Sequence, residues 1–211
     1  STWDCLLEKA SFDPGRILKR HAEMRGVIRT CHAVRLGFRQ IKGLSLDRME
    51  IFCARRGEGY QSVRDVWLRS GLDVDEIEKL AEADAFRSIG LDRRSALWAV
   101  RALDRKSAAE KLPLFDRPAV NLPDLEPKAI LPEMPLGQHV IHDYRSLGLS
   151  LKAHPVAFVR KQLNEAGVTP NAVLTSVPDG RRVSVAGLVL VRQRPGKGNA
   201  IFLTLEDEDA V

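Results

Sequence analysis

The chain has 211 residues, of which 44% are hydrophobic and 6% aromatic, and its formal net charge is +5. That length allows one large domain or two small ones, and no apolar run approaches the ~20 residues of a membrane span. The N-terminus lacks the cationic start and the apolar core of a signal peptide. Three widely spaced cysteines without a CxxC pair argue against a disulfide framework or a zinc site, so we expect a cytoplasmic protein.

The N-terminal part combines short strands with a cluster of cations. Residues 3–8 and 33–38 alternate in polarity and predict two strands, while Pro14 predicts a helix that starts near residue 15. From Arg16 to Arg48 the chain has nine bases and two acids, a net charge of +7 that exceeds the +5 of the whole chain. This clustering indicates a polyanionic partner.

A glycine turn lies at the end of this basic stretch. Residues 36–45 read as the end of a strand, then a turn, then a helix from about Asp47. Such a turn can present backbone N–H groups to an anion beside a helix N-terminus. On these residues alone, an ordinary strand-to-helix turn remains the alternative. The predicted phosphate contacts are the N–H groups of Gly43 and Ser45 and the side chains of Lys42, Arg39 and Arg48.

Residues 46–108 have helical periodicity throughout. The predicted helices cover 47–56, 60–70, 73–86 and 92–109, and glycines separate them. Asp73 with Glu76 is a capping-box pair, and Asp92 is a further N-cap. The predicted core positions are Met49, Phe52, Cys53, Val63, Val66, Trp67, Ile77, Leu80, Ala81, Leu97, Trp98 and Leu103.

The C-terminal half begins with a change in composition. Six of the chain's 11 prolines lie in residues 112–136, which predicts an extended linker. Helices are expected at 137–147 and 155–166. A β-hairpin is expected from residues 182–192 and 200–205, with a turn at Pro195–Gly198. A hairpin of this size is not stable alone in water, so it indicates the beginning of a larger β-domain. The predicted fold is therefore mainly α with a β part.

Several motifs in order along the chain resemble the bacterial error-prone DNA polymerases of the C family, the translesion relatives of the replicative polymerase III alpha subunit. These motifs are residues 3–5, 35–44, 59–65, 80–86, 93–98, 143–144, 154–155, 185–189 and 204–207. The resemblance covers nearly the whole chain and implies a C-terminal segment of such a polymerase.

The resemblance implies a domain order. Residues 1–40 would be the tail of the fingers domain, and 41–109 a helix-hairpin-helix region that grips duplex DNA. Residues 110–136 would be a proline-rich linker, 137–180 a helical connector, and 181–211 the first strands of an incomplete OB-fold. The parent enzyme would be a DNA-directed DNA polymerase that uses Mg²⁺ and deoxynucleotide triphosphates. Its catalytic aspartates would lie upstream, so we expect no catalytic residue, metal or cofactor in this segment.

The sequence departs from the family pattern at three places. The stretch 14–30 is longer than usual, so the resemblance assigns no role to its bases. Ser45 stands where a second glycine is typical of helix-hairpin-helix turns, and Ala210 replaces a glycine expected in the OB turn.

Further motifs have functional and structural interpretations. Arg192, Arg194 and Lys197 surround the predicted hairpin turn and are candidates for contact with single-stranded DNA, or are simply solvated. Residues 206–209 lack the glycine and spacing of a cation loop, so a charged turn is expected. His139 and His142 lack a third ligand nearby and are expected at the surface.

An alternative function is a protein-interaction module that recruits a sliding clamp or accessory mutagenesis proteins. Leu112, Leu114 and Phe115 resemble the short clamp-binding peptide of bacterial polymerases, although Lys111 stands where that peptide usually has Gln. The other interpretation of these residues is a linker that packs apolar side chains onto the helices. A self-standing enzyme is disfavoured because no nucleophile, metal cluster or acid–base pair assembles from the sequence.

Overall fold

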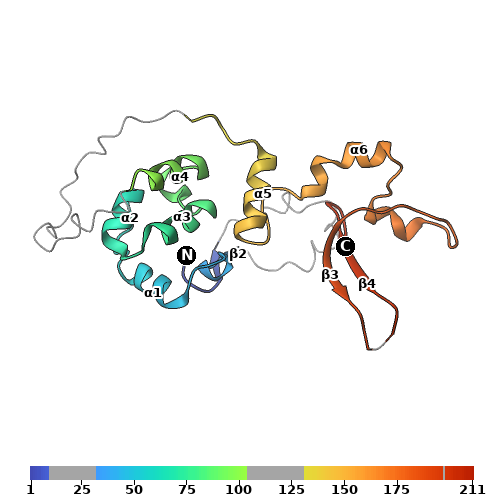
Figure 1. The fold of residues 1–211 in the computed structure, drawn as a ribbon, viewed down its shortest axis with the longest axis horizontal. Coiled ribbons are helices and arrows are strands. Elements are labelled where there is room, and N and C mark those ends of the chain that lie inside the picture. The colour runs from blue at the N-terminus through green and yellow to red at the C-terminus, as the bar shows by residue number, and fades with distance from the viewer. Residues whose placement is uncertain (10–31, 104–130, 197) are drawn as a thin grey trace, which may run out of the picture. The chain divides into compact units, whose positions relative to one another are not determined.

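A computed structural model of the chain describes residues 1–9, 32–103, 131–196 and 198–211. The described residues form two compact units (Figure 1). The helical unit comprises residues 1–8, 33–103, 131–135 and 142–149, and the hairpin unit comprises residues 9, 32, 136–141, 150–196 and 198–211. Within the described residues, the helices are too short and too polar to cross a membrane.

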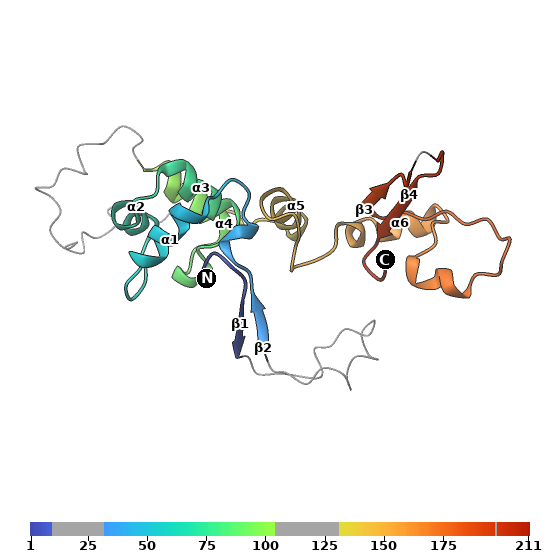
Figure 2. The same ribbon diagram turned by 90° about the horizontal axis from the view of Figure 1, so that it is seen from below.

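Two short strands lead into the helical unit. β1 (Leu6–Lys9) pairs with β2 (His32–Arg35), and Figure 2 shows them running in opposite directions. Both predicted strands are present but shorter than expected. The second ends early because Phe38 is buried and begins the 3-10 helix η3 (Phe38–Gln40). The helix predicted from residue 15 lies outside the described residues.

Gly37 allows the turn between β2 and η3 to lie against the N-terminal segment. The backbone N–H of Phe38 donates to the carbonyl of Thr2 (2.9 Å), and that of Arg39 donates to the carbonyl of Trp3 (3.1 Å). A Cβ atom at position 37 would lie only 2.2 Å from the Trp3 carbonyl oxygen. Only glycine fits this close approach of two backbones.

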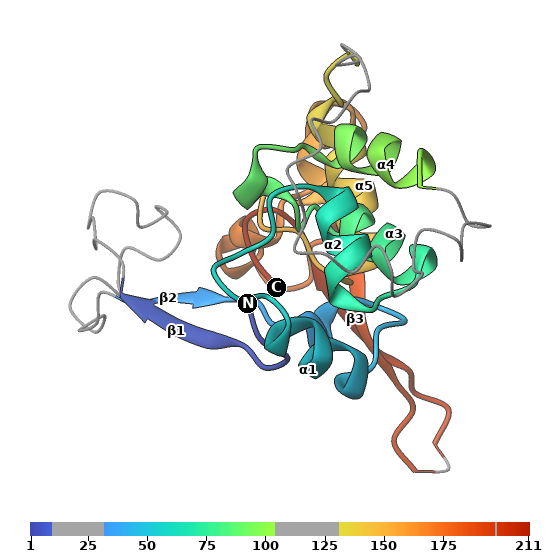
Figure 3. The same ribbon diagram turned by 90° about the vertical axis from the view of Figure 1, so that its left-hand side faces the viewer.

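The helices predicted between residues 46 and 108 are confirmed with shifted ends. They are α1 (Leu46–Ala54), α2 (Val63–Ser70), α3 (Val74–Glu82) and α4 (Arg93–Arg101), with the 3-10 turn η4 (Arg87–Ile89) before α4. In Figure 3 these helices group together in one bundle. The buried core is Phe38, Ile41, Met49, Phe52, Val63, Val66, Trp67, Leu72, Ile77, Leu80, Ala81, Phe86, Ala96, Val100 and Leu103.

The predicted N-caps explain where these helices begin. Asp73 and Glu76 form the predicted capping box, and the side chain of Asp92 accepts from the backbone N–H of Ser95 at 2.7 Å. The Ser62 side chain caps α2 in the same way. Each cap satisfies an N–H group that the first turn of a helix would otherwise leave without a partner.

The predicted inward position of Trp98 is wrong. Its side chain is 52% exposed, whereas the predicted core residue Trp67 is 3% exposed. The buried positions of α4 are Arg93, Ala96 and Val100, and Trp98 lies two residues from the last two. At about 100° per residue, that spacing places Trp98 on the opposite face of the helix.

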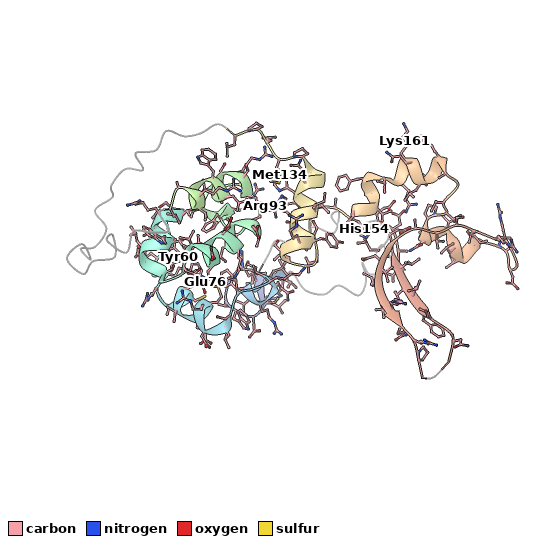
Figure 4. All side chains as sticks on the ribbon, in the orientation of Figure 1. Tyr60, Glu76, Arg93, Met134, His154 and Lys161 are labelled. Carbon is pink, nitrogen blue, oxygen red and sulfur yellow. The ribbon has the colours of Figure 1, made fainter. Side chains whose placement is uncertain are left out.

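A buried ion pair joins α4 to α5 (Leu136–Ser146), and its arginine, Arg93, is labelled in Figure 4. The Arg93 guanidinium donates to the carboxylate of Asp143, and the two side chains are 0% and 3% exposed. Further along α5, the Ser146 hydroxyl donates within the helix to the carbonyl of His142 (2.9 Å), and the Glu82 carbonyl at the end of α3 lies 3.4 Å from the same hydroxyl oxygen. The ion pair thereby holds the C-terminal half of α5 to α4.

The hairpin unit contains short helices and one β-hairpin. The helical elements are η7 (Pro155–Phe158), α6 (Arg160–Glu165) and η8 (Asn171–Ser176). β3 (Leu188–Gln193) and β4 (Phe202–Glu206) pair antiparallel, with Val189 opposite Leu205 and Val191 opposite Thr204. Leu190 is therefore the extra residue of a bulge.

The hairpin itself is confirmed, but its first strand begins at Leu188 rather than at Arg182 as predicted. Ser184 instead forms an isolated parallel bridge with Val168. Apolar side chains on both faces of the hairpin stay about half exposed, including Val189, Leu203 and Phe202.

The acidic turn after β4 is a charged turn in which one side chain accepts several backbone hydrogen bonds. Asp207 is 2% exposed and accepts the backbone N–H groups of Asn171 (2.7 Å), Asp209 and Ala210 (both 2.9 Å). Burial acts to raise the pKa of Asp207, but these N–H groups and the Arg160 guanidinium together lower it. The charged turn that the sequence predicts therefore has a buried carboxylate at its centre.

Candidate nucleic-acid interface

Residues 41–45 form a tight turn that enters α1 with its polar side outward. Ile41 is buried and Leu44 is half-buried against the core, whereas Lys42, Gly43 and Ser45 are exposed. Gly43 has φ +81°, a left-handed conformation that costs an L-residue about 1–2 kcal/mol. The two apolar side chains anchor the turn, and its remaining residues face solvent.

The N-terminus of α1 is not capped by a side chain. Ser45 occupies the N-cap position with extended geometry but makes no capping hydrogen bond from its hydroxyl. In α2, α3 and α4, by contrast, the N-cap side chain accepts a backbone N–H group of the first turn. The exposed first turn of α1 can therefore offer N–H groups to an external anion.

Two lysines lie at this turn. The backbone N–H of Lys42 donates to the carbonyl of Ser146 (2.9 Å), and its ammonium donates to the carbonyl of Tyr144 (3.3 Å). The Lys79 ammonium of α3 donates to the Gly43 carbonyl at 2.8 Å. Sequence reasoning missed Lys79, since its contact with Gly43 is formed only when α3 packs beside the turn.

The two predicted arginines have internal partners. Arg39 forms an exposed ion pair with Asp4 at 2.8 Å. Arg48 is held by Glu76 (2.6 Å) and by the carbonyl of Gly71 (2.7 Å). The hydrogen bond from Arg48 lowers the pKa of the Glu76 carboxyl, against the opposing effect of burial. The assignment of both arginines to phosphate contact stays a prediction.

The predicted cations of the β-hairpin belong to the separate hairpin unit. Arg192 and Arg194 are both exposed. Arg194 donates to the carbonyl of Gly198 (2.8 Å) and to the side chain of Asn199 (3.1 Å), so it also stabilises the turn between the strands. Lys197 lies outside the described residues.

Other sequence candidates contribute no site in the described part of the chain. Leu112, Leu114 and Phe115 lie outside it. Among the residues that the structure describes, no group of three or more His, Cys, Asp and Glu side chains could hold a metal ion. His139 and His142 were expected at the surface, and both are half-buried. Burial, with Arg93 and Arg145 nearby, lowers the pKa of His142.

A family model and several known proteins match this chain. Residues 1–96 match the model of a family described as "Helix-hairpin-helix motif". The chain is 79% identical over 211 residues to an error-prone DNA polymerase of Mesorhizobium japonicum and 57% identical over 213 residues to error-prone DNA polymerase 1 of Rhizobium meliloti. It is 46% identical over 216 residues to an error-prone DNA polymerase of Caulobacter vibrioides.

Each of these alignments covers 100% of the chain but only 19–20% of the relative. The chain therefore spans about a fifth of the length of the polymerases that it matches. These matches confirm the resemblance predicted from the motifs: over its whole length the chain is similar to the error-prone DNA polymerases.

Proposed function

We propose that this chain is the DNA-binding segment of an error-prone DNA polymerase, and that it holds primer–template duplex through phosphates during translesion synthesis. The observation that carries the proposal is the exposed, uncapped turn at Gly43, with Lys42 and Lys79 beside it. Main-chain N–H groups and ammonium groups bind phosphate oxygens without regard to base sequence. The contact would position the duplex and would not select a sequence.

The match of residues 1–96 to a helix-hairpin-helix family supports this assignment. Within the turn, Lys42 is held by carbonyls of α5, and Lys79 by the carbonyl of Gly43. Both ammonium groups therefore sit at defined places before DNA arrives, which reduces the side-chain entropy lost on binding. This arrangement favours a duplex contact over a solvated strand-to-helix turn.

The finer architecture belongs to the same proposal. Residues 1–40 would end a fingers domain and 181–211 would begin an OB-fold, whose cations Arg192 and Arg194 would meet single-stranded template. Mg²⁺ and deoxynucleotide triphosphates would bind to catalytic residues elsewhere in the parent polymerase. No catalytic step is assigned to the residues of this chain.

The test is a salt titration of binding to a fluorescent DNA duplex. Lys42→Glu should weaken binding by about tenfold, roughly 1.4 kcal/mol, and should reduce the slope of log K against log[salt] by about 1. The weakening should be the same for duplexes of different sequence, because the contact is with the backbone.

Lys161→Glu is the matched control, since it makes the same change of charge at an exposed lysine of α6 in the hairpin unit. If both variants lose affinity equally, the turn has no special role and the proposal fails. If the wild-type chain binds a sliding clamp but not duplex DNA, the alternative function as a protein-interaction module is correct.

A further inference from the structure

α4 carries an exposed tryptophan on the face that points away from the core. Trp98 is 52% exposed, although tryptophan is among the side chains that proteins bury most completely on average. The duplex contact proposed above does not use this ring, and about half of the residue is open to solvent. An indole of this size on a helix surface is a platform for an aromatic or apolar ligand.

Cations flank this ring along the same face. Arg94 is four residues before Trp98 and Arg101 is three residues after it, the spacings at which side chains are neighbours on a helix. Arg94 is half-buried and donates to the carbonyl of Pro132, while Arg101 is exposed. α4 itself contains no acidic residue, and the adjoining residues 131–135 contain one, Glu133. Along α4 itself, the exposed indole is therefore flanked by cations.

We propose that Arg94, Trp98 and Arg101 form a binding site for an unpaired nucleic-acid strand, in which a base stacks on Trp98 and the arginines contact the flanking phosphates. Stacking on an aromatic side chain combined with cations along the backbone is the common mode of binding to single strands. This site is distinct from the turn at Gly43 and does not rest on the proposed duplex contact.

The chemistry favours an unpaired strand over the other occupants. Bases within a duplex stack on one another and present only their edges, so they cannot cover the indole face. A protein partner would cover the ring with apolar side chains, and it would also need acidic groups opposite two arginines. In a polyanion with exposed planar bases, one base can stack on the ring while the phosphates contact both arginines.

The test uses the full 211-residue chain and a fluorescent oligo(dT) strand. Trp98→Ala should raise Kd by at least about fivefold, the lower end of what stacking contributes per base, and Trp98→Phe should restore part of the affinity. Arg101→Gln should reduce the salt slope by about 0.7 for a single strand. In the wild-type chain, oligo(dT) should quench tryptophan fluorescence, and Trp98→Phe should lose most of that quenching.

Leu68→Ala on α2 is the matched control, because Leu68 is an exposed apolar side chain of the same unit. It should leave Kd for oligo(dT) unchanged. In a chain that also carries Arg192→Gln and Arg194→Gln, Trp98→Ala should still raise Kd for oligo(dT) by the same factor.

Three results would overturn the inference. The first is an unchanged Kd for oligo(dT) in Trp98→Ala, with thermal unfolding like that of the wild-type chain. The second is an equal loss in Leu68→Ala. The third is a change in self-association of Trp98→Ala by sedimentation without a change in strand binding, which would identify the face as a protein contact.

Discussion

Replacement of Asp143 by Asn tests how the candidate interface is supported from within the helical unit. Asn has the shape of Asp but no charge, so the Arg93 guanidinium loses its carboxylate partner in a site where both side chains are almost completely buried. The same stretch of α5 supplies the carbonyls of Tyr144 and Ser146 that hold Lys42. The variant should therefore lower the free energy of unfolding and increase local opening of the turn at Gly43.

The magnitude follows from the burial of the pair. Removal of one partner of a buried ion pair typically costs about 3–5 kcal/mol, and exposures of 0% and 3% leave solvent little scope to reduce this. A cost of that size is a large fraction of the ~5–15 kcal/mol that stabilises an ordinary domain. The double variant Arg93→Met with Asp143→Leu should recover most of the loss, since an apolar pair of similar volume needs no counter-charge.

Urea unfolding followed by circular dichroism measures the free energy of unfolding of each variant. Amide hydrogen exchange measures local opening of residues 42–48 under native conditions. We expect faster exchange at the turn in Asp143→Asn and wild-type exchange in the Asp92→Ala variant, which weakens the N-cap of α4 without removing the ion pair. A loss below about 1 kcal/mol, or a double variant as unstable as Asp143→Asn, would contradict the role assigned to this pair.

Three further predictions concern the turn and its neighbour α3. Gly43→Ala should lower the free energy of unfolding by about 1–2 kcal/mol in urea titration because of the left-handed φ, and wild-type stability would contradict the strain. Asp73→Ala removes the capping box and should cost about 1 kcal/mol, measured in the same way, whereas a neutral result would show that the cap is dispensable. The Arg48 contact lowers the pKa of Glu76 below its ordinary 4.5, so its stabilisation is present above that pH and lost as pH falls. Stability measured from pH 7 to pH 3 should therefore fall less steeply in Glu76→Gln than in the wild-type chain, and parallel curves would refute this linkage.

The local structure of the helical unit was largely predictable. Capping residues and helix periodicity are properties of neighbouring positions, so Asp73, Glu76 and Asp92 placed the starts of α3 and α4 correctly. The turn at Gly43 was predictable for the same reason, because a glycine before a helix start allows the positive φ that a tight turn requires.

Contacts between distant segments were not predictable. Lys79 reaches Gly43 across 36 positions, and Asp207 accepts the N–H of Asn171 across 36 positions in the other unit. The spacing of apolar residues predicts Trp98 on the inward face, whereas residues 93, 96 and 100 form the buried face of α4. Burial of an arginine is energetically costly unless a carboxylate such as Asp143 pairs with it. That pairing depends on the tertiary fold and cannot be read from neighbouring positions in the sequence.

The exposed first turn of α1 has a consequence for damaged templates. Under the proposed function, its amide hydrogens would meet oxygen atoms of the sugar–phosphate chain, which an altered base leaves chemically unchanged. A bulky adduct or a missing base downstream of synthesis would then present this turn with the same partners as intact DNA. Tolerance of lesions would thus begin with a DNA contact that does not distinguish damaged bases from intact ones.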